Sequence, residues 1–270
     1  MRIEPMKKQT DEPERRILAR TVTRCLCIGS LAAIATLALP GMLAPNGSPV
    51  AAEIVEGYVI PQDSQRSQRT SGSGSRSGCP RYNSTQFHLL VPNDHIAATA
   101  TKSPAFFAYV SEADVPLALT VAKLKEPPLT LYKRSLKLRQ PGITKFEIPK
   151  ERPLKLQEGE EYRLTLSIIC NSKRPSKNPY VQVDFKYVSA SPALQKQLQA
   201  NPSNRAKIYA RSGIWYDALV ASYQSAILPA RSEPLSEADF FAHLLKQIGI
   251  SPEVAEQAKH RVEGNIIVLK

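Results

Sequence analysis

Apolar and polar residues alternate in short segments between Cys79 and Ala190, and prolines, glycines and asparagines separate the segments. In the clearest segment, 162–170, the apolar side chains share one parity with Cys170, and the polar side chains share the other. A period of two places successive side chains on opposite faces of a half-buried strand. The same reasoning predicts strands at 85–91, 104–110, 116–124, 129–132, 136–139, 144–148, 162–170 and 180–188.

The spacing of these strands predicts a mainly β protein, an immunoglobulin- or fibronectin-like antiparallel β-sandwich over 79–190 followed by C-terminal α-helices. The apolar parity reverses between Leu131 and Leu136, which predicts a bulge or turn at Lys133–Arg134. Tyr162 follows a glycine turn as at a tyrosine corner, where the hydroxyl bonds to the backbone of the preceding turn. A core tyrosine after an ordinary turn is the alternative.

The period becomes helical after the predicted sandwich. Ser191–Pro192 combines a capping residue with a proline at the first helical position, which predicts a short helix to about residue 200. A longer helix is expected over 203–227, with Trp215 in its apolar stripe. We expect this helical extension, 191–230, to pack on the sandwich.

The last part of the chain, 231–270, is expected to form a C-terminal helical appendage. Its helices are predicted to begin near residues 236 and 251, because a capping box and a Ser-Pro pair occur there. The apolar tail 266–269 is expected to add an edge strand or to dock in a groove.

The first 52 residues have the three-part pattern of a secretory signal peptide. A basic segment precedes the uncharged run 25–39, and small residues lead to Ala52, where cleavage is expected. An uncleaved inner-membrane anchor is the alternative, although the run is short for a span. We expect an exported protein, periplasmic or extracellular, with no stable membrane span after cleavage. Residues 53–78 are rich in Ser, Gly and Arg, which predicts a flexible linker.

Two of the four cysteines, Cys79 and Cys170, lie beyond the predicted signal peptide. An exported chain with two cysteines most simply forms one intramolecular disulfide. Two buried thiols or an intermolecular bridge are the alternatives.

The chain carries 36 basic and 24 acidic residues, a net charge of +12. Ten basic residues stand against three acidic ones in 123–155, so this stretch could present a positive face to an acidic polysaccharide or another polyanion. Lysines that keep an edge strand from pairing explain the same pattern. Export and the lack of interleaved aromatic residues argue against nucleic acid. The residues assigned to polyanion binding are Lys133, Arg134, Lys137 and Arg139.

The sequence contains no motif for a phosphate loop, a dinucleotide site or a serine nucleophile. The histidines and cysteines are not spaced as metal ligands. Asp94–His95 near a serine suggests a catalytic dyad, but adjacency in sequence is not geometry, and a polar loop explains the pair. We therefore expect no enzymatic activity, no metal and no cofactor.

Four segments occur in a characteristic order: Gly74–Cys79, Pro104–Val110, Leu-x-x-Gly-x-x-Tyr leading to Ile-x-Cys, and Gly-Ile-Trp-Tyr-Asp-Ala-Leu at Gly213–Leu219. Over roughly 72–230 the chain resembles a mainly cyanobacterial family, domain of unknown function 928 (DUF928). It departs from the family's Phe-Trp-Tyr run by having Ala108 between Phe107 and Tyr109. The resemblance implies an exported protein and assigns no reaction, ligand or catalytic residue.

These observations favour a non-enzymatic module that binds another envelope or secreted protein through its helical segment. Trp215, Tyr216 and Asp217 are the predicted partner-binding residues. Trp215 belongs to the apolar stripe and is expected to cap the core, whereas Tyr216 and Asp217 are expected to point away from it. An acidic glycan bound at the basic strand face is the alternative partner.

Overall fold

The structure is a computed structural model that describes residues 57–62, 71–72, 79–226, 237–251, 254 and 266–269. The chain divides into Met1–Ala52 and Glu53–Lys270, and all described residues belong to the second unit. The predicted signal peptide, 1–52, therefore lies outside the described residues, as does most of the helix expected from residue 251. No helix in the described ranges is long and apolar enough to cross a membrane.

One sheet has six strands in the order β1-β9-β8-β5-β6, with β3 also paired to β9. Its centre confirms the predicted alternation, because Tyr162, Leu164, Leu166 and Ile168 of β8 are buried while the residues between them are partly exposed. The strands are β1 (Ser71–Gly72), β3 (Ala97–Thr99), β5 (Val115–Lys123), β6 (Leu129–Leu138), β8 (Glu161–Ile168) and β9 (Tyr180–Tyr187).

The second sheet has four strands in the order β10-β7-β4-β2. Phe106 of this sheet meets Phe185 of the other, with 5.3 Å between ring centroids, so the two sheets share an apolar core. The predicted tail strand is confirmed at Ile266–Val268. The strands are β2 (Phe87–Leu89), β4 (Ala105–Val110), β7 (Gly142–Glu147) and β10 (Ile266–Val268).

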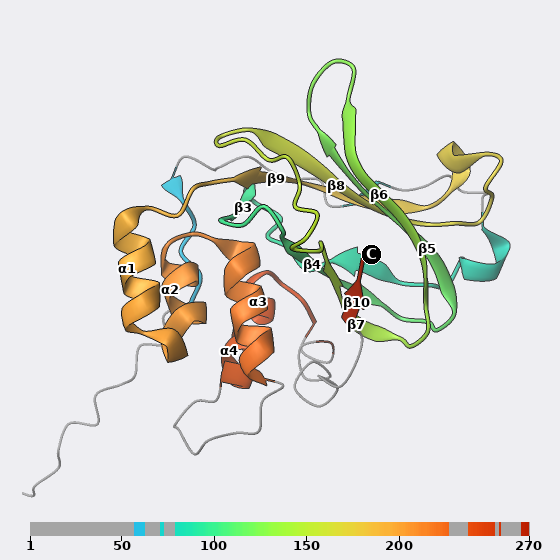
Figure 1. The fold of residues 1–270 in the computed structure, drawn as a ribbon. Coiled ribbons are helices and arrows are strands. Elements are labelled where there is room, and N and C mark those ends of the chain that lie inside the picture. Colours follow the sequence, from blue (N-terminus) through green and yellow to red (C-terminus); the bar gives the residue numbers. More distant parts are fainter. Residues whose placement is uncertain are drawn as a thin grey trace, which may run out of the picture. The chain divides into compact units, whose positions relative to one another are not determined.

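The fold is mainly β, with two sheets and C-terminal helices (Figure 1). The sheets are not purely antiparallel as predicted, because β10 runs parallel to β7 and β3 runs parallel to β9. Both parallel strands have only three residues. The tie expected of a tyrosine corner is present, since the Tyr162 hydroxyl accepts a hydrogen bond from the Gln157 backbone N–H at 2.7 Å. The immunoglobulin-like assignment itself stays a prediction.

β5 and β6 form a long hairpin whose turn projects beyond the neighbouring strands (Figure 1). The two strands predicted at 129–132 and 136–139 are one strand, so the turn expected at Lys133–Arg134 is wrong. The irregularity lies earlier: Val121 pairs with Tyr132 and Ala122 with Thr130. One extra residue on β6 there reverses the parity that the apolar pattern showed.

The helices lie together at one side of the sheets (Figure 1). Ser191 caps the first helix as predicted, because its Oγ accepts from the Leu194 backbone N–H at 3.2 Å. The single helix expected over 203–227 is wrong, since Gly213 has a positive φ of 70° that ends one helix before the next begins. The helices are α1 (Pro192–Ala200), α2 (Arg205–Arg211), α3 (Trp215–Ala226) and α4 (Glu237–Gln247), with short 3₁₀ turns η2 (Pro80–Tyr82), η3 (Pro175–Lys177) and η4 (Pro202–Asn204).

The second half of α3 and the helix α4 cover the outer face of the four-stranded sheet. Phe107 of β4 contacts Tyr223 of α3 and Phe241 of α4, with ring centroids 5.1 and 5.8 Å apart. Lys145 of β7 also lies beneath α3, and only 3% of its side chain is exposed. The middle of β4 is therefore buried on both faces, by the other sheet on one side and by helices on the other.

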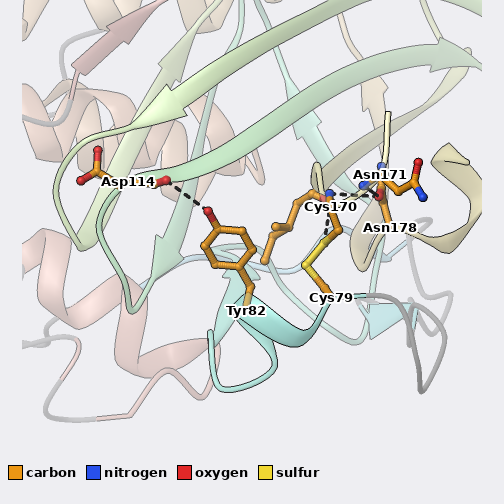
Figure 2. Close-up of a disulfide and its surroundings, with 7 residues drawn as sticks. Cys79, Tyr82, Asp114, Cys170, Asn171 and Asn178 are labelled. Atoms are coloured by element: carbon orange, nitrogen blue, oxygen red, sulfur yellow. Dashed lines mark hydrogen bonds between the residues drawn. A yellow bond between two sulfur atoms is a disulfide. The ribbon is translucent and has the colours of Figure 1, made fainter. Parts of the chain in front are cut away.

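The predicted disulfide between Cys79 and Cys170 is present, with Cα atoms 5.4 Å apart (Figure 2). It joins the residue before η2 to the segment just after β8, across 91 positions of sequence. Beside it, the Asn178 side-chain oxygen accepts from the backbone N–H groups of Cys170 and Asn171 at 3.1 and 2.9 Å (Figure 2). The buried Asn178 thereby closes the loop that follows the bridge.

Candidate functional site

Trp215, the first residue of α3, lies inside the molecule. Its indole N–H donates to the Leu90 carbonyl oxygen at 3.1 Å. Trp215 therefore joins α3 to the segment that follows β2, which agrees with the core-capping position expected for it.

Tyr216 is also buried, so its predicted outward orientation is wrong. Its ring lies edge-on to Phe106 and Phe185, which belong to different sheets. The N-terminal end of α3 thus inserts between the two sheets and buries both of its first residues. The Tyr216 hydroxyl has no hydrogen-bond partner among the described residues, and burial raises the pKa of Tyr216.

Asp217 is partly buried and bonds within the chain, so it does not point away from the body as expected. Its Oδ2 accepts from the Thr99 hydroxyl and from the Ala100 backbone N–H, both at 2.9 Å. Burial raises the pKa of Asp217, and these two hydrogen bonds oppose that shift. The three residues predicted to bind a partner therefore attach α3 to the sheets in this structure.

The sequence reasoning explained Asp94–His95 as a polar loop and missed that His95 is buried beside Tyr58. The Tyr58 hydroxyl lies 2.9 Å from Nε2 of His95, and Nδ1 of His95 lies 2.7 Å from a carboxylate oxygen of Asp94. Tyr58 and His95 are 4% and 1% exposed, whereas the Asp94 side chain reaches solvent. The hydroxyl also lies 3.2 Å from the Gly213 carbonyl oxygen, at the turn between α2 and α3.

Residues 57–62 are docked on the body, so the flexible linker predicted over 53–78 does not hold there. Gln247 of α4 accepts from the Tyr58 backbone N–H at 2.8 Å and donates to its carbonyl oxygen at 2.7 Å. The Val59 N–H donates to the Ala210 carbonyl oxygen at 3.0 Å. The apolar run Gly57–Ile60, which precedes the Ser/Gly/Arg tract, is the signal that could have indicated this anchor.

The Tyr58–His95–Asp94 contacts connect the N-terminal anchor to the loop that precedes β3. Burial, with a smaller contribution from Asp94, raises the pKa of Tyr58, so the hydroxyl keeps its proton near neutral pH. The Tyr58 hydroxyl makes hydrogen bonds within the protein, to His95 and to the Gly213 carbonyl oxygen. The arrangement therefore serves as a structural tie between the N-terminal anchor and the α2–α3 turn.

The basic residues assigned to polyanion binding lie on or next to β6, the last strand of its sheet, and all four are exposed. Lys133 and Lys137 pair with Thr120 and Pro116 and share one face of the strand. Arg134 pairs with Leu119, whose side chain is buried, and therefore lies on the opposite face. The four cations thus line an edge and do not share one face.

Two other basic residues of 123–155 form ion pairs with acidic residues, so their charges are offset and add little to a positive surface. Lys123 pairs with Glu160 at 3.1 Å, and the buried Lys145 pairs with Glu147 at 3.0 Å. On the edge itself Lys137 pairs with Asp114 at 2.8 Å. This hydrogen-bonded Lys137, with Arg139 and Arg81 nearby, lowers the pKa of Asp114.

No group of three or more His, Cys, Asp or Glu residues that could hold a metal ion occurs in the described ranges. The fold and these sites define a disulfide-bridged two-sheet protein, with helices against one sheet and a basic strand at the edge of the other. The chain matches the family described as Domain of Unknown Function (DUF928) over residues 71–258 and belongs to this family, as the resemblance indicated. No curated protein matches the chain.

Proposed function

We propose that the protein is a non-enzymatic interaction module of the cell envelope, which binds an acidic segment of another exported protein along β6. The observation that carries the proposal is the free edge of the six-stranded sheet. β6 ends the strand order, and its described pairing is with β5 alone. Such an edge presents unpaired backbone N–H and C=O groups, to which an extended segment can add as a further strand.

Charge makes this edge selective for acidic segments. Lys133, Lys137 and Arg139 are exposed at intervals along the edge, and Leu129 at the start of β6 is 46% exposed. Cations of this kind speed the encounter with acidic partners and disfavour basic ones. The exposed Lys137–Asp114 pair is weak enough to be exchanged for a partner's carboxylate.

Other features support the setting of this proposal. A disulfide persists in oxidising compartments, which agrees with export and with the signal peptide proposed for residues 1–52. The Gln157–Tyr162 hydrogen bond supports an immunoglobulin- or fibronectin-like sandwich, a fold on which binding surfaces commonly occur. The buried positions of Trp215 and Tyr216 favour β6 over the helical segment as the contact surface.

An acidic polysaccharide is the second partner class. It is favoured by the exposure of Lys133, Arg134, Lys137 and Arg139 on both faces of the edge, because a flexible polyanion can wrap around an edge without pairing with its backbone. The two partner classes differ in one measurable respect. An added peptide strand protects β6 backbone amides from hydrogen exchange, whereas a polysaccharide contacts only the side chains.

The experiment measures the retention of the full chain on immobilised poly-glutamate and on immobilised polygalacturonate, each eluted with salt. The variant carries Lys133→Ser, Lys137→Ser and Arg139→Ser. A matched control carries Lys173→Ser, Arg174→Ser and Lys177→Ser, which removes the same charges from exposed positions around η3. Amide exchange of β6 is measured in parallel with soluble poly-glutamate.

We expect the β6 variant to elute from poly-glutamate at lower salt than the control, because it makes fewer charge contacts with the column for salt to screen. We also expect poly-glutamate to slow amide exchange in β6. If both variants elute together, the cations of β6 only keep the edge from pairing, and the proposal is wrong. Preferential retention on polygalacturonate without amide protection would establish the polysaccharide instead.

A further inference from the structure

The C-terminal tail, residues 266–269, covers the β7 edge, which is the outer side of the strand Gly142–Glu147 (Figure 1). Its strand β10 runs parallel to β7, and Ile267 pairs with Phe146. Ile267 packs against the apolar core that contains Phe146, and Leu269, two residues further on, is 2% exposed. The tail is therefore an added strand that directs alternate apolar side chains into the core.

Backbone and side-chain hydrogen bonds hold the end of the tail. The Leu269 backbone N–H donates to the Glu147 carbonyl oxygen at 3.0 Å, and the Tyr132 hydroxyl donates to the Leu269 carbonyl oxygen at 3.1 Å. Tyr132 belongs to β6, so the tail lies where the edges of the two sheets meet. These contacts define the ligand that the β7 edge accepts: an extended segment, parallel to β7, with an apolar side chain at every second position.

The contacts of the tail are few for the length of chain that they order. One buried leucine, Leu269, and one partly buried isoleucine, Ile267, supply its contacts with the core. Ordering the backbone and side chains of 266–269 costs conformational entropy that offsets much of this gain. A three-residue strand near the end of a chain belongs to the part of a structure that opens most easily. We therefore expect the tail to leave and re-enter the β7 edge while the sheets stay folded.

The β7 edge offers more pairing than the tail uses. β7 has six residues, and β10 pairs with the last three of them. Over 142–144 the described pairing of β7 is with β4 alone, and Gly142 and Ile143 are partly exposed. A longer strand that also paired with these residues would make more backbone hydrogen bonds than the tail makes.

The tail is also an addition to the part of the chain that matches the family. The matched residues, 71–258, include β7 and end before β10. The β7 edge thus belongs to the shared part of the fold, whereas the segment that fills it does not.

We propose that the β7 edge is a strand-binding site for an extended apolar segment of another exported protein, and that the C-terminal tail fills the edge until such a segment replaces it. A second copy's tail would make the same contacts without the tether that keeps the resident tail nearby, so it would not displace that tail. A longer segment would, because it also pairs with 142–144. This site takes an apolar ligand and so goes beyond the acidic segment proposed for β6.

The test uses the full chain with Leu269→Asp, which places a charge in the core and so releases the tail. Ile60→Asp is the matched control, because Ile60 is 41% exposed and lies in another segment. The probe is a labelled peptide with the sequence of residues 264–270, Gly-Asn-Ile-Ile-Val-Leu-Lys, preceded by two lysines for solubility and followed by fluorescence anisotropy. Leu269→Ala replaces Leu269→Asp if the latter loses the native circular dichroism spectrum.

Two modified peptides test whether the probe binds as a strand. In the first, the peptide bond before the leucine is N-methylated, which removes the N–H that corresponds to the donor to Glu147. In the second, Val-Thr-Val replaces Gly-Asn, so that the strand is long enough to pair with 142–144.

We expect Leu269→Asp to bind the probe at least about tenfold more tightly than the unchanged chain, in which the resident tail fills the site. Ile60→Asp should bind as weakly as the unchanged chain. N-methylation should weaken binding to Leu269→Asp roughly tenfold, and adding Tyr132→Phe about threefold, because each removes one hydrogen bond. The longer peptide should bind roughly tenfold more tightly than the probe.

Any of four results would overturn the assignment: no binding of the probe at millimolar concentration by Leu269→Asp or Leu269→Ala, equal binding by Leu269→Asp and Ile60→Asp, equal binding of the N-methylated peptide, or equal binding of the longer peptide. A dimer of the unchanged chain that Leu269→Asp abolishes would also overturn it, because the ligand would then be a second copy's tail. Replacing the β6 cations should change the affinity for the probe less than about twofold. The β6 proposal is judged by poly-glutamate retention, so failure of one proposal is distinguishable from failure of the other.

Discussion

The hydroxyl of Tyr58 anchors the segment 57–62 to the body of the protein, and Tyr58→Phe tests that role. The substitution keeps the ring, which stands edge-on to Trp215 with 5.0 Å between centroids. It removes the hydrogen bonds at 2.9 Å to His95 and at 3.2 Å to the Gly213 carbonyl oxygen. Both partner groups lie in buried surroundings and would lose a partner that water does not easily replace.

An unsatisfied buried group costs about 1–3 kcal/mol. Residues 57–62 lie at the start of the described body, so they can detach before the sheets unfold. This limits how much stability the substitution removes. We therefore expect Tyr58→Phe to lower the free energy of unfolding by about 1–2 kcal/mol, or Tm by about 2–8 °C. The Val59 amide, which donates to Ala210, should exchange with solvent roughly tenfold faster.

The assays are urea unfolding followed by circular dichroism, and hydrogen exchange resolved at Val59. Tyr109→Phe is the matched control, because Tyr109 is partly exposed and its hydroxyl makes no hydrogen bond to the residues that the structure describes. If Tyr58→Phe and Tyr109→Phe have the same stability, and Val59 exchange is unchanged in both, the anchor does not depend on this hydroxyl and our reasoning is refuted.

Three further predictions concern the body of the protein. Replacing Cys79 and Cys170 by Ser should lower the free energy of unfolding by roughly 4 kcal/mol, because the bridge closes a long loop; an unchanged urea midpoint would contradict this. Folding raises the pKa of Asp217, so the free energy of unfolding should fall as the pH rises from 3.8, the ordinary pKa of an aspartate, through the pKa of Asp217 in the folded protein. Urea titrations at several pH values should show this fall for the unchanged protein and not for Asp217→Asn. The same pH profile for both proteins would count against the prediction. Glu147→Gln should cost about 2 kcal/mol in thermal unfolding by leaving the buried Lys145 ammonium without a negative charge beside it, and adding Lys145→Met should recover most of the loss; a double variant as unstable as the single one would exclude this account.

The sequence indicates the strands well because a period of two is a local property of the chain. β8 and β9 occur where the alternation is strongest, and Cys170 pairs with Cys79 as the cysteine count suggested. The parity reversal around Leu131 was also visible, but its cause was placed two residues too late. A change of parity shows only that a bulge lies somewhere near the apolar residues whose faces differ. Its exact position follows from the pairing of β6 with β5.

The candidate site was less predictable because it depends on contacts between distant segments. The chain continues in an apparently helical pattern through Gly213, and the break there depends on its positive φ and on Pro61, which lies 2.5 Å from where a Cβ would be. A helix that restarts at Trp215 turns Tyr216 toward both sheets. Tyr58 lies far from His95 in sequence, so their contact has no local signature.

The central claim, that β6 is the contact surface, is tested most directly by crosslinking in cells that make the protein. A photoreactive amino acid replaces Ser135, which is exposed between Lys133 and Lys137 on β6, and a control replaces the exposed Gln195 on α1. We predict one discrete crosslinked protein from position 135, which is lost when the β6 cations are replaced and is absent from position 195. No crosslinked protein from position 135, or the same products from both positions, would contradict the claim.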